Sequence, residues 1–258
     1  MTWWARLKRH PVAIDATLRN CLTLTYALPA RHLRGLLPPG LELETRGDQG
    51  FLAIALVQAE SLRPAGLPAS LGQSFFLAGY RIFTTFRLPD GRALRGLRIL
   101  RSDANRLRMV MGGNLLTHYN YHRCLARVEA SDDRIAVVVR TPDGFGDLDL
   151  TADLTTPVLP AGSVFPSVRD ARRFAGPLPY TFDYEPGTHA IIAINATRTN
   201  WRPSPVAVDV RRVGFFDQAV FEGSTPVLAG AFHVSHVNYR WQRGVRYALG
   251  NRKRLEVA

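Results

Sequence analysis

Lysine is almost missing from this sequence, since Lys8 and Lys253 are the only two lysines among 33 lysine and arginine residues. The Walker loop of nucleotide-binding enzymes needs a lysine after its glycines, and no such loop occurs. The Gly-x-Ser-x-Gly turn that carries the nucleophile of α/β-hydrolases is missing as well. The sequence therefore excludes two large classes of enzyme site.

Cysteines and long apolar runs are scarce too. Cys21 and Cys124 are the only cysteines, and two isolated cysteines make neither a disulfide framework nor a zinc site. No apolar stretch reaches the ~18 residues that a membrane-spanning helix needs, and the N-terminus lacks the apolar region of a secretory signal. We therefore expect a cytoplasmic protein. Its 258 residues are expected to form one domain, with residues 1–11 as an N-terminal helix or arm.

Positive charge is in excess, with a formal net charge of +12. Such an excess points to nucleic acid or anionic lipid as a partner. The arginines are spread along the chain, however, and no zinc-finger, helix-turn-helix or RNA-binding pattern accompanies them, which argues against nucleic acid. Trp3 and Trp4 lie beside basic residues and could seat a helix on a membrane surface, but packing on the protein's own body is the favoured interpretation. Tyr239 and Trp241 are candidate contacts of a homo-oligomer.

Short alternating segments separated by turn residues dominate the chain, which is typical of a mainly β domain. Residues 51–57 form an almost continuous apolar run, as expected of a strand buried on both faces. Pro-Asp-Gly turns at 89–91 and 142–144 predict hairpins. The predicted strands cover residues 21–28, 51–57, 73–88, 114–128, 135–140, 189–197, 206–213 and 227–241.

Few helices are expected. The spacing of apolar residues and the flanking residues predict helices over residues 29–37, 102–111 and 167–174. Gly112 and Gly113 are expected to end the helix over 102–111. Many strands with few helices indicate a sandwich or a barrel, in a mainly β fold of the α+β kind.

The segment 114–123 is the richest in side chains that could do chemistry. Successive side chains of a strand point to opposite faces, so His118, Asn120 and His122 would share one face, with Tyr119 and Tyr121 on the other. One interpretation is a pocket wall with a titratable histidine and hydrogen-bonding partners. The other is an exposed polar strand, and the pattern leaves both open.

The spacing of the histidines does not indicate a metal site. On a strand, His118 and His122 would lie about 13 Å apart, which is too far for one ion without other ligands. His233 and His236 would face opposite ways. We expect neither a metal nor a cofactor.

Four stretches resemble a YqjF-like bacterial family of unknown function. Residues 26–43 contain its Leu-Pro-Pro-Gly-Leu block after a strand and a short helix, and residues 80–86 are similar to one of its strands. Residues 101–107 resemble the start of one of its helices, and residues 117–128 resemble a further strand. The resemblance is clear over residues 10–130 and thin beyond them.

This family is similar in fold to acetoacetate decarboxylase, which implies a closed, mostly antiparallel β-barrel with a few flanking helices and an internal pocket. Acetoacetate decarboxylase forms a Schiff base through a lysine of lowered pKa, which stands in a Gly-Phe-Pro-Lys-Lys motif. Asn120 and Tyr121 stand where the two lysines of that motif would be. The resemblance therefore implies the barrel without the Schiff-base reaction.

What remains is a pocket in which Arg81 would hold a substrate carboxylate. His118 is the predicted acid or base and Tyr121 the predicted donor to a developing oxyanion, while Asn120 and His122 would bind substrate. The expected function is that of a cofactor-independent enzyme on a small carbonyl or carboxylate compound. The alternative is a non-catalytic barrel that binds a small carboxylate or a lipid.

Overall fold

Strands make up most of the protein, as predicted. The structure, a computed structural model, describes residues 7–174 and 178–250, so Trp3, Trp4, Lys253 and most of the predicted N-terminal arm lie outside the described residues. The longer strands are β1 (Ile14–Pro29), β4 (Gln49–Pro64), β5 (Gln73–Arg87), β6 (Ala93–Ala104), β8 (Leu125–Ala130), β9 (Arg134–Arg140), β10 (Leu148–Asp153), β11 (Tyr180–Glu185), β12 (Ala190–Thr199), β14 (Ala207–Val213) and β15 (Val227–Trp241). The short strands are β2 (Leu41–Leu43), β3 (Thr45–Arg46), β7 (Tyr121–Arg123), β13 (Ser204–Pro205) and β16 (Val245–Ala248). The α-helices are α2 (Arg31–Arg34), α3 (Leu107–Leu116) and α4 (Val168–Phe174).

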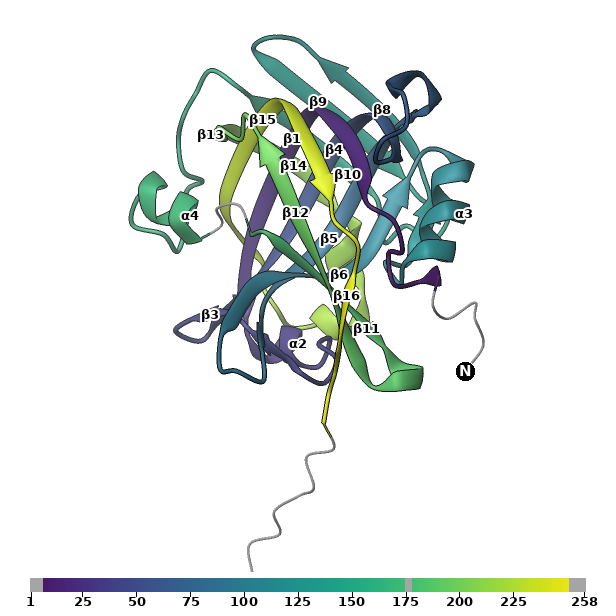
Figure 1. The fold of residues 1–258 in the computed structure, drawn as a ribbon. Coiled ribbons are helices and arrows are strands. Elements are labelled where there is room, and N and C mark those ends of the chain that lie inside the picture. The colour runs from purple at the N-terminus through teal and green to yellow at the C-terminus, as the bar shows by residue number, and fades with distance from the viewer. Residues whose placement is uncertain (1–6, 175–177, 251–258) are drawn as a thin grey trace, which may run out of the picture.

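Seven of these strands pair into a closed ring (Figure 1). Their order is β15, β1, β4, β5, β6, β11 and β12, and residues 196–199 of β12 pair in turn with residues 238–241 of β15. Neighbouring strands are antiparallel except β6 and β11, which are parallel where residues 180–182 pair with residues 96–98. The predicted antiparallel arrangement therefore holds everywhere in the ring except at this one seam.

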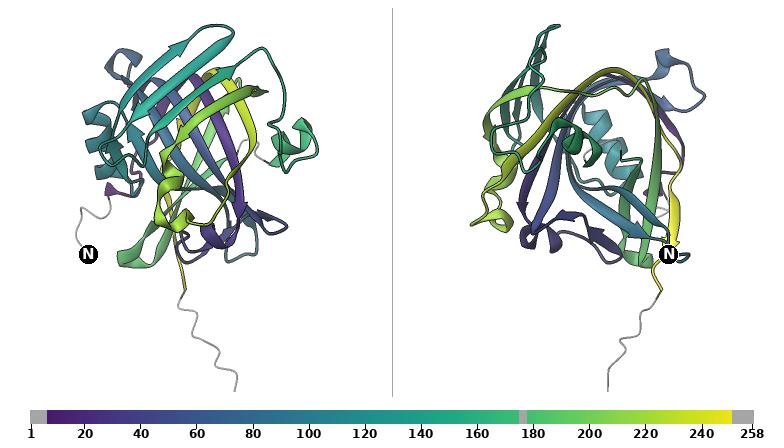
Figure 2. Two further views of the ribbon diagram at one scale, coloured as in Figure 1. Left: turned by 180° about the vertical axis from the view of Figure 1, so that it is seen from behind. Right: turned by 90° about the vertical axis from the view of Figure 1, so that its left-hand side faces the viewer.

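A second sheet covers one outer side of the ring. It consists of β14, β10, β9 and β8 in that order, and Figure 2 shows it as a separate layer beside the ring. Every second residue of β9 is buried, namely Ile135, Val137 and Val139, because side chains of a strand alternate between two faces. These residues and Leu148 and Leu150 of β10 pack against outward-facing residues of β1, β4 and β5.

The wall strands β1, β4 and β5 separate two interiors, and this explains their long apolar runs. In β4, Leu52, Ile54 and Leu56 face the second sheet, while Ala53 and Val57 face the inside of the ring. All five are at most 6% exposed. The prediction that residues 51–57 are buried on both faces is confirmed.

Helices close the two ends of the ring. Met109 of α3 packs with inward-facing residues of β1 and β4, including Leu18 and Val57. Ala171 of α4 belongs to a cluster with Phe51 at the other end. In the view along the ring on the right of Figure 2, α4 lies in front of the ring and α3 behind it. The enclosed space therefore lies between these two helices.

The predicted boundaries over residues 102–128 are wrong. Strand β6 continues to Ala104, α3 extends to Leu116, and β7 is only three residues long before β8 joins the second sheet. The glycine pair does not end the helix. A Cβ at Gly113 would lie 2.4 Å from the ring of Tyr121, so this glycine serves close packing inside the helix.

Both Pro-Asp-Gly turns are confirmed. The first joins β5 to β6 and the second joins β9 to β10. Their glycines, Gly91 and Gly144, have φ values of 86° and 73°, a conformation that glycine adopts without steric cost.

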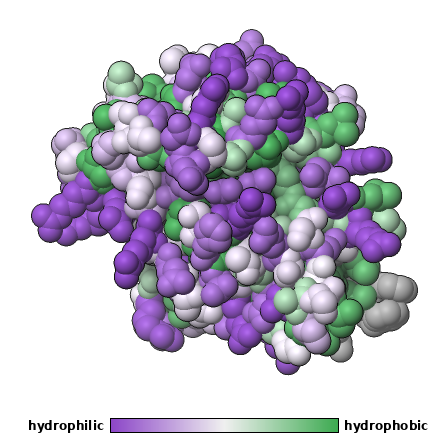
Figure 3. Space-filling view, turned by 90° about the horizontal axis from the view of Figure 1, so that it is seen from above, coloured by the Kyte–Doolittle hydropathy of each residue, from purple (hydrophilic) through white to green (hydrophobic). Residues whose placement is uncertain are grey.

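Hydrophilic side chains cover most of the face seen from above, with apolar patches between them (Figure 3). Many of the arginines are paired with carboxylates, such as Arg240 with Asp15 and Arg87 with Glu42. No helix in the described part of the chain is long and apolar enough to cross a membrane.

Candidate functional site

A pocket of about 240 Å³ lies inside the ring. Its walls come from β1, β4, β5, β6, β12, β15, α3 and the residues just before β1, and most of its side chains are aliphatic or aromatic. Arg81, Arg198 and His10 are the basic side chains that line it, and no carboxylate or lysine of the described residues does so. The pocket thus combines apolar walls with uncompensated positive charge.

Arg81 is the cation that β5 directs into this pocket. Its guanidinium lies over Gly79, where a Cβ would come within 3.1 Å of Nε and 3.0 Å of a terminal nitrogen. The Nε atom is buried without a hydrogen-bond partner, and no carboxylate in the described ranges forms an ion pair with this arginine. A buried charge without a partner is costly, so the site favours an anion that would pair with it.

Two tyrosines line the pocket beside Arg81. The hydroxyl of Tyr119 is buried without a partner, and the residue is only 6% exposed. Burial raises the pKa of Tyr119 well above its usual value and that of Tyr121 to about 12, while the nearby charge of Arg81 lowers both. Both phenols are therefore protonated at neutral pH and can donate hydrogen bonds.

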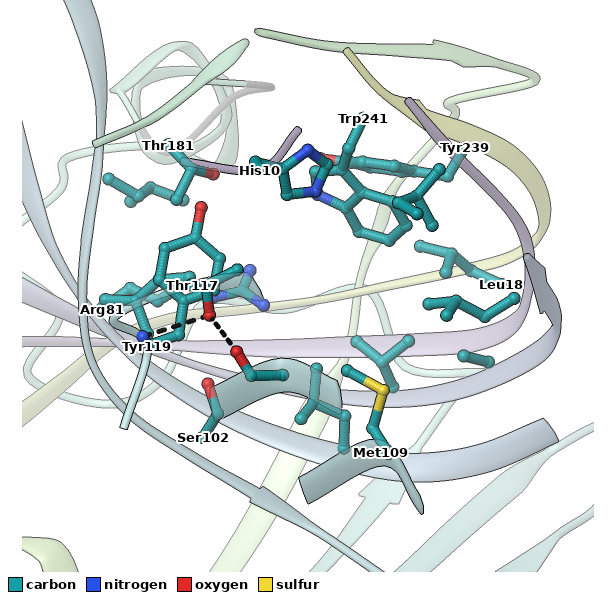
Figure 4. A pocket seen from close by; sticks show the side chains of 18 of the residues that line it. His10, Leu18, Arg81, Ser102, Met109, Thr117, Tyr119, Thr181, Tyr239 and Trp241 are labelled. Carbon is teal, nitrogen blue, oxygen red and sulfur yellow. Dashed lines mark hydrogen bonds between the residues drawn. The ribbon is translucent and has the colours of Figure 1, made fainter. Parts of the chain in front are cut away.

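The last turn of α3 and the loop after it hold the backbone of these tyrosines in place. The amide of Asn114 bonds the backbone of Tyr121 twice, accepting from its N–H and donating to its carbonyl, both at 2.9 Å. The hydroxyl of Thr117 donates to the carbonyl of Gly113 at 2.8 Å and accepts from the N–H of Tyr119 at 3.3 Å (Figure 4). The two phenols are thereby fixed relative to the helix.

His10 lines the pocket from the segment before β1. Its backbone has a φ of 54°, and it is held by hydrogen bonds from its N–H to Leu116 at 3.1 Å and from Gly244 to its carbonyl at 3.0 Å. Burial lowers the pKa of His10, although a bond to the backbone of Gln242 raises it, and its Nδ1 is buried without a partner. Non-glycine residues in this backbone region cluster at functional sites. A neutral imidazole in such a pocket can accept a proton.

The structure brings together only two of the five side chains singled out from the sequence. Arg81 and Tyr121 line the pocket, whereas His118, Asn120 and His122 are not among its lining residues. Nε2 of His122 lies 3.0 Å from Oδ1 of Asn120, in an exposed pair. The roles predicted for these residues remain predictions.

His118 has a carboxylate partner outside the pocket lining. Its Nδ1 lies 2.9 Å from Asp183, which also accepts from the backbone N–H of His118 at 2.8 Å and from Arg98 at 2.7 Å. Burial raises the pKa of Asp183, but the bond from His118 and the charge of Arg98 lower it further, below the usual value. This ion group anchors the loop that carries Tyr119.

Sequence reasoning missed His10, Tyr119, Arg198 and Trp201 as pocket residues. The alternation argument had set Tyr119 and Tyr121 on one face, and this is the face that meets the pocket. For His10 no local signal existed, because its place depends on contacts with Leu116 and Gly244, far along the chain. Within the described ranges, no group of three or more histidine, cysteine, aspartate or glutamate side chains is arranged to hold a metal ion.

The fold of this chain is similar to that of acetoacetate decarboxylase-like enzymes. An acetoacetate decarboxylase-like enzyme from Sphingomonas wittichii RW1 superimposes with a TM-score of 0.59 at 14% identity, covering 94% of this chain and 95% of that chain. Acetoacetate decarboxylase from Legionella pneumophila gives a TM-score of 0.61 at 11% identity, covering 92% and 88%. MppR, an enduracididine biosynthesis enzyme complexed with the condensation product of pyruvate and imidazole 4-carboxaldehyde, gives 0.59 at 14% identity, covering 92% and 89%. At these identities the likeness shows the fold alone.

The chain belongs to the DUF2071 family of uncharacterized conserved proteins, whose family model matches residues 15–239. No curated protein matches the sequence. The predicted resemblance is confirmed for an acetoacetate decarboxylase-like fold and for a family of unknown function.

Proposed function

We propose that the protein is a cofactor-independent enzyme that acts on a small carbonyl or carboxylate compound, and that the strand ring serves as a barrel that encloses this compound. The observation that carries the proposal is the Arg81 guanidinium, which is directed into an apolar pocket and lacks a carboxylate partner among the described residues. A planar guanidinium binds a carboxylate through two parallel hydrogen bonds. The substrate carboxylate supplies the missing charge.

The other polar groups of the pocket suit chemistry at a carbonyl next to that carboxylate. Tyr119 and Tyr121, both protonated, donate hydrogen bonds to an oxygen that gains negative charge. Burial lowers the pKa of His10, which favours its neutral form. In this form His10 accepts the proton that the substrate loses in the reaction. An acid/base role for His118 would require its ring to leave Asp183 and enter the pocket, so His10 takes that role here.

The chemistry proposed does not pass through an imine. A Schiff base needs a lysine amine, and the described pocket lining contains none. The same observation supports the alternative function, a non-catalytic protein that binds a small carboxylate or a lipid. A small molecule that co-purifies with the protein, is detected by mass spectrometry and is never converted would favour this alternative.

The proposal is tested by thermal unfolding with a panel of small oxo-acids, hydroxy-acids and fatty acids. A ligand that binds only the folded state raises Tm, and we expect a rise of several degrees with one class of carboxylate. Arg81→Met should abolish this rise. Arg87→Met, which removes an exposed arginine of the same strand that is paired with Glu42, should preserve it.

Two outcomes would contradict the proposal. One is the absence of any stabilisation across the panel in a protein that unfolds cooperatively. The other is an equal rise in Tm for the wild type and Arg81→Met, since the anion would then bind elsewhere.

A further inference from the structure

A second arginine shares the pocket with Arg81. Arg198 lies on β12 where this strand pairs with β15 and closes the ring, and its register partner there is Tyr239. Its guanidinium carbon lies 4.6 Å from the centre of the Trp201 ring and 5.4 Å from that of Tyr239. One terminal nitrogen donates to the carbonyl of Leu178 at 2.8 Å. These contacts fix the orientation of the guanidinium.

The charge of Arg198 is left without an anion. None of the carboxylates in residues 7–174 and 178–250 forms an ion pair with Arg198, and none lines the pocket. A guanidinium has five N–H donors, and among the described residues the bond to Leu178 uses one of them. Aromatic faces stabilise the cation but do not accept its in-plane N–H bonds.

The indole of Trp201 adds an unused donor beside this cation. Its Nε1 atom is buried and has no hydrogen-bond partner in the part of the chain that the structure describes, and Trp201 lines the pocket. A buried donor without a partner costs roughly the free energy of its desolvation. An anion that bonds both Arg198 and Trp201 would remove this cost.

The two arginines line the same pocket from different strands, Arg81 from β5 and Arg198 from β12. Both lower the pKa values of Cys21 and Tyr239, which burial raises. For Tyr121, in contrast, Arg81 is the charged neighbour that lowers the pKa. Cys21 and Tyr239 therefore lie within reach of both cations, and Tyr121 lies at the Arg81 side.

Two guanidinium groups in one largely apolar cavity repel each other and lose hydration. Anions that occupy the cavity would offset both costs. We infer that the pocket contains a second anion subsite, made of Arg198 and Trp201, and that its ligand is a small dicarboxylate. This inference rests on the proposed function, in which Arg81 binds the first carboxylate.

The size of the cavity sets the scale of this ligand. At about 240 Å³ it is smaller than the roughly 300–1,000 Å³ of sites for drug-sized molecules. One carboxylate binds Arg81, and the other binds Arg198 with the indole N–H of Trp201. A short apolar body lies between them, against the aliphatic wall.

The test compares dicarboxylates with monocarboxylates of equal carbon number by calorimetry and thermal unfolding. The pairs are succinate with butyrate, glutarate with pentanoate, and adipate with hexanoate. We expect the best dicarboxylate to bind at least tenfold more tightly than its partner. Arg198→Met should reduce its affinity to that of the monocarboxylate and leave monocarboxylate binding unchanged.

Two further variants separate the subsite from general effects. Arg202→Met removes the same charge from an exposed neighbouring residue outside the pocket lining and should keep the preference for dicarboxylates. Arg198→Lys keeps the cation and should retain part of the preference if Arg198→Met proves unstable.

The outcomes distinguish this inference from the proposed function. Equal affinity of the wild type for both members of each pair would overturn the second subsite and leave the proposed function standing. An Arg198→Met variant that is folded and still prefers the dicarboxylate would also overturn the subsite. No binding of any carboxylate would overturn both.

Discussion

Arg101 is a buried arginine that pairs with two carboxylates. Its side chain is 7% exposed, and its Nε lies 2.8 and 3.0 Å from the two oxygens of Asp103, which is completely buried. Its terminal nitrogens bond Asp143 at 2.6 and 3.0 Å. Burial raises the pKa of Asp103, while the bonds from Arg101 lower that of Asp143 to about 2.

We expect Arg101→Met to destabilise the protein strongly. The substitution leaves the Asp103 carboxylate buried without its partner, and breaking a buried ion pair in this way costs about 3–5 kcal/mol. Urea denaturation at neutral pH measures the loss. The matched control, Arg92→Met, breaks an exposed pair with Asp90 and should change stability little. Equal losses in both variants would contradict the argument.

His10 should make stability depend on pH. Burial lowers its pKa in the folded protein, so the unfolded chain binds more protons between the folded pKa and the unfolded value of about 6.5. The free energy of unfolding should therefore fall as the pH drops through ~6.5. His10→Asn should flatten this fall, because asparagine tolerates a positive φ and does not titrate.

The check is Tm as a function of pH for both proteins. Some slope should remain in His10→Asn, since burial also lowers the pKa of His233. Equal slopes of Tm against pH in both proteins would show that the pKa of His10 is the same in the folded and the unfolded state.

At the scale of elements, two adjacent glycines of α3 make a matched pair. A Cβ at Gly113 would lie 2.4 Å from the ring of Tyr121, whereas a Cβ at Gly112 would meet nothing within 4 Å. Gly113→Ala should cost about 1–3 kcal/mol through overpacking and displace a pocket tyrosine. Gly112→Ala should gain about 0.5–1 kcal/mol, because alanine favours the helix. Chemical denaturation of both variants measures these changes in the free energy of unfolding. An unchanged free energy of unfolding in Gly113→Ala would show that α3 can shift to make room for the added methyl group.

The same helix marks where sequence patterns stop being sufficient. Strands that bury one face, such as β9, can be predicted from the alternation of apolar and polar residues. The turns at 89–91 and 142–144 can be predicted from the conformational preferences of proline, aspartate and glycine. The end of α3 could not be predicted in this way. Gly113 stands inside the helix because a Cβ at this position would collide with the ring of Tyr121, which follows in the next loop and strand. Strands β6 and β11 were not predicted, although β6 pairs with β5 and β11 pairs with β12 in the antiparallel way.

The residues of the candidate site also fall into those that could be predicted from the sequence and those that could not. Arg81 and Tyr121 were singled out through the pocket that the family resemblance implies, and both lie in strands, where the resemblance could be followed residue by residue. The pocket positions of His10 and Arg198 could not, since each depends on pairing between distant parts of the chain. Residues 117–120 form no strand, so the alternation rule could not show that His118 would bind Asp183.

At the scale of the whole molecule, the two interiors share the wall strands β1, β4 and β5. We therefore expect residues 1–258 to unfold as one unit. Leu150→Ala, in the core between ring and second sheet, should cost about 2–5 kcal/mol and lower the midpoint of ligand release together with that of unfolding. Leu125→Ala, 72% exposed in the same sheet, should stay within about 0.5 kcal/mol.

Circular dichroism and a fluorescent pocket ligand, followed in the same denaturant series, provide the measurement. Coincident midpoints in the wild type and in Leu150→Ala support one cooperative unit. Two separate transitions would instead divide the chain into units that fold on their own.

Closure of the ring also determines where copies of this chain can adhere to one another. Each ring strand has a neighbour on both sides over at least part of its length, so no strand of the described ring is free along a whole edge. The second sheet has two outer strands, β8 and β14, and β8 carries Arg127 and Glu129. Charged side chains on an outer strand discourage aggregation. Among the described strands, free edges belong to β8 and β14 and to the short strands β2, β3, β7, β13 and β16, so growth of a fibril through β8 or β14 would use the two longest of these edges.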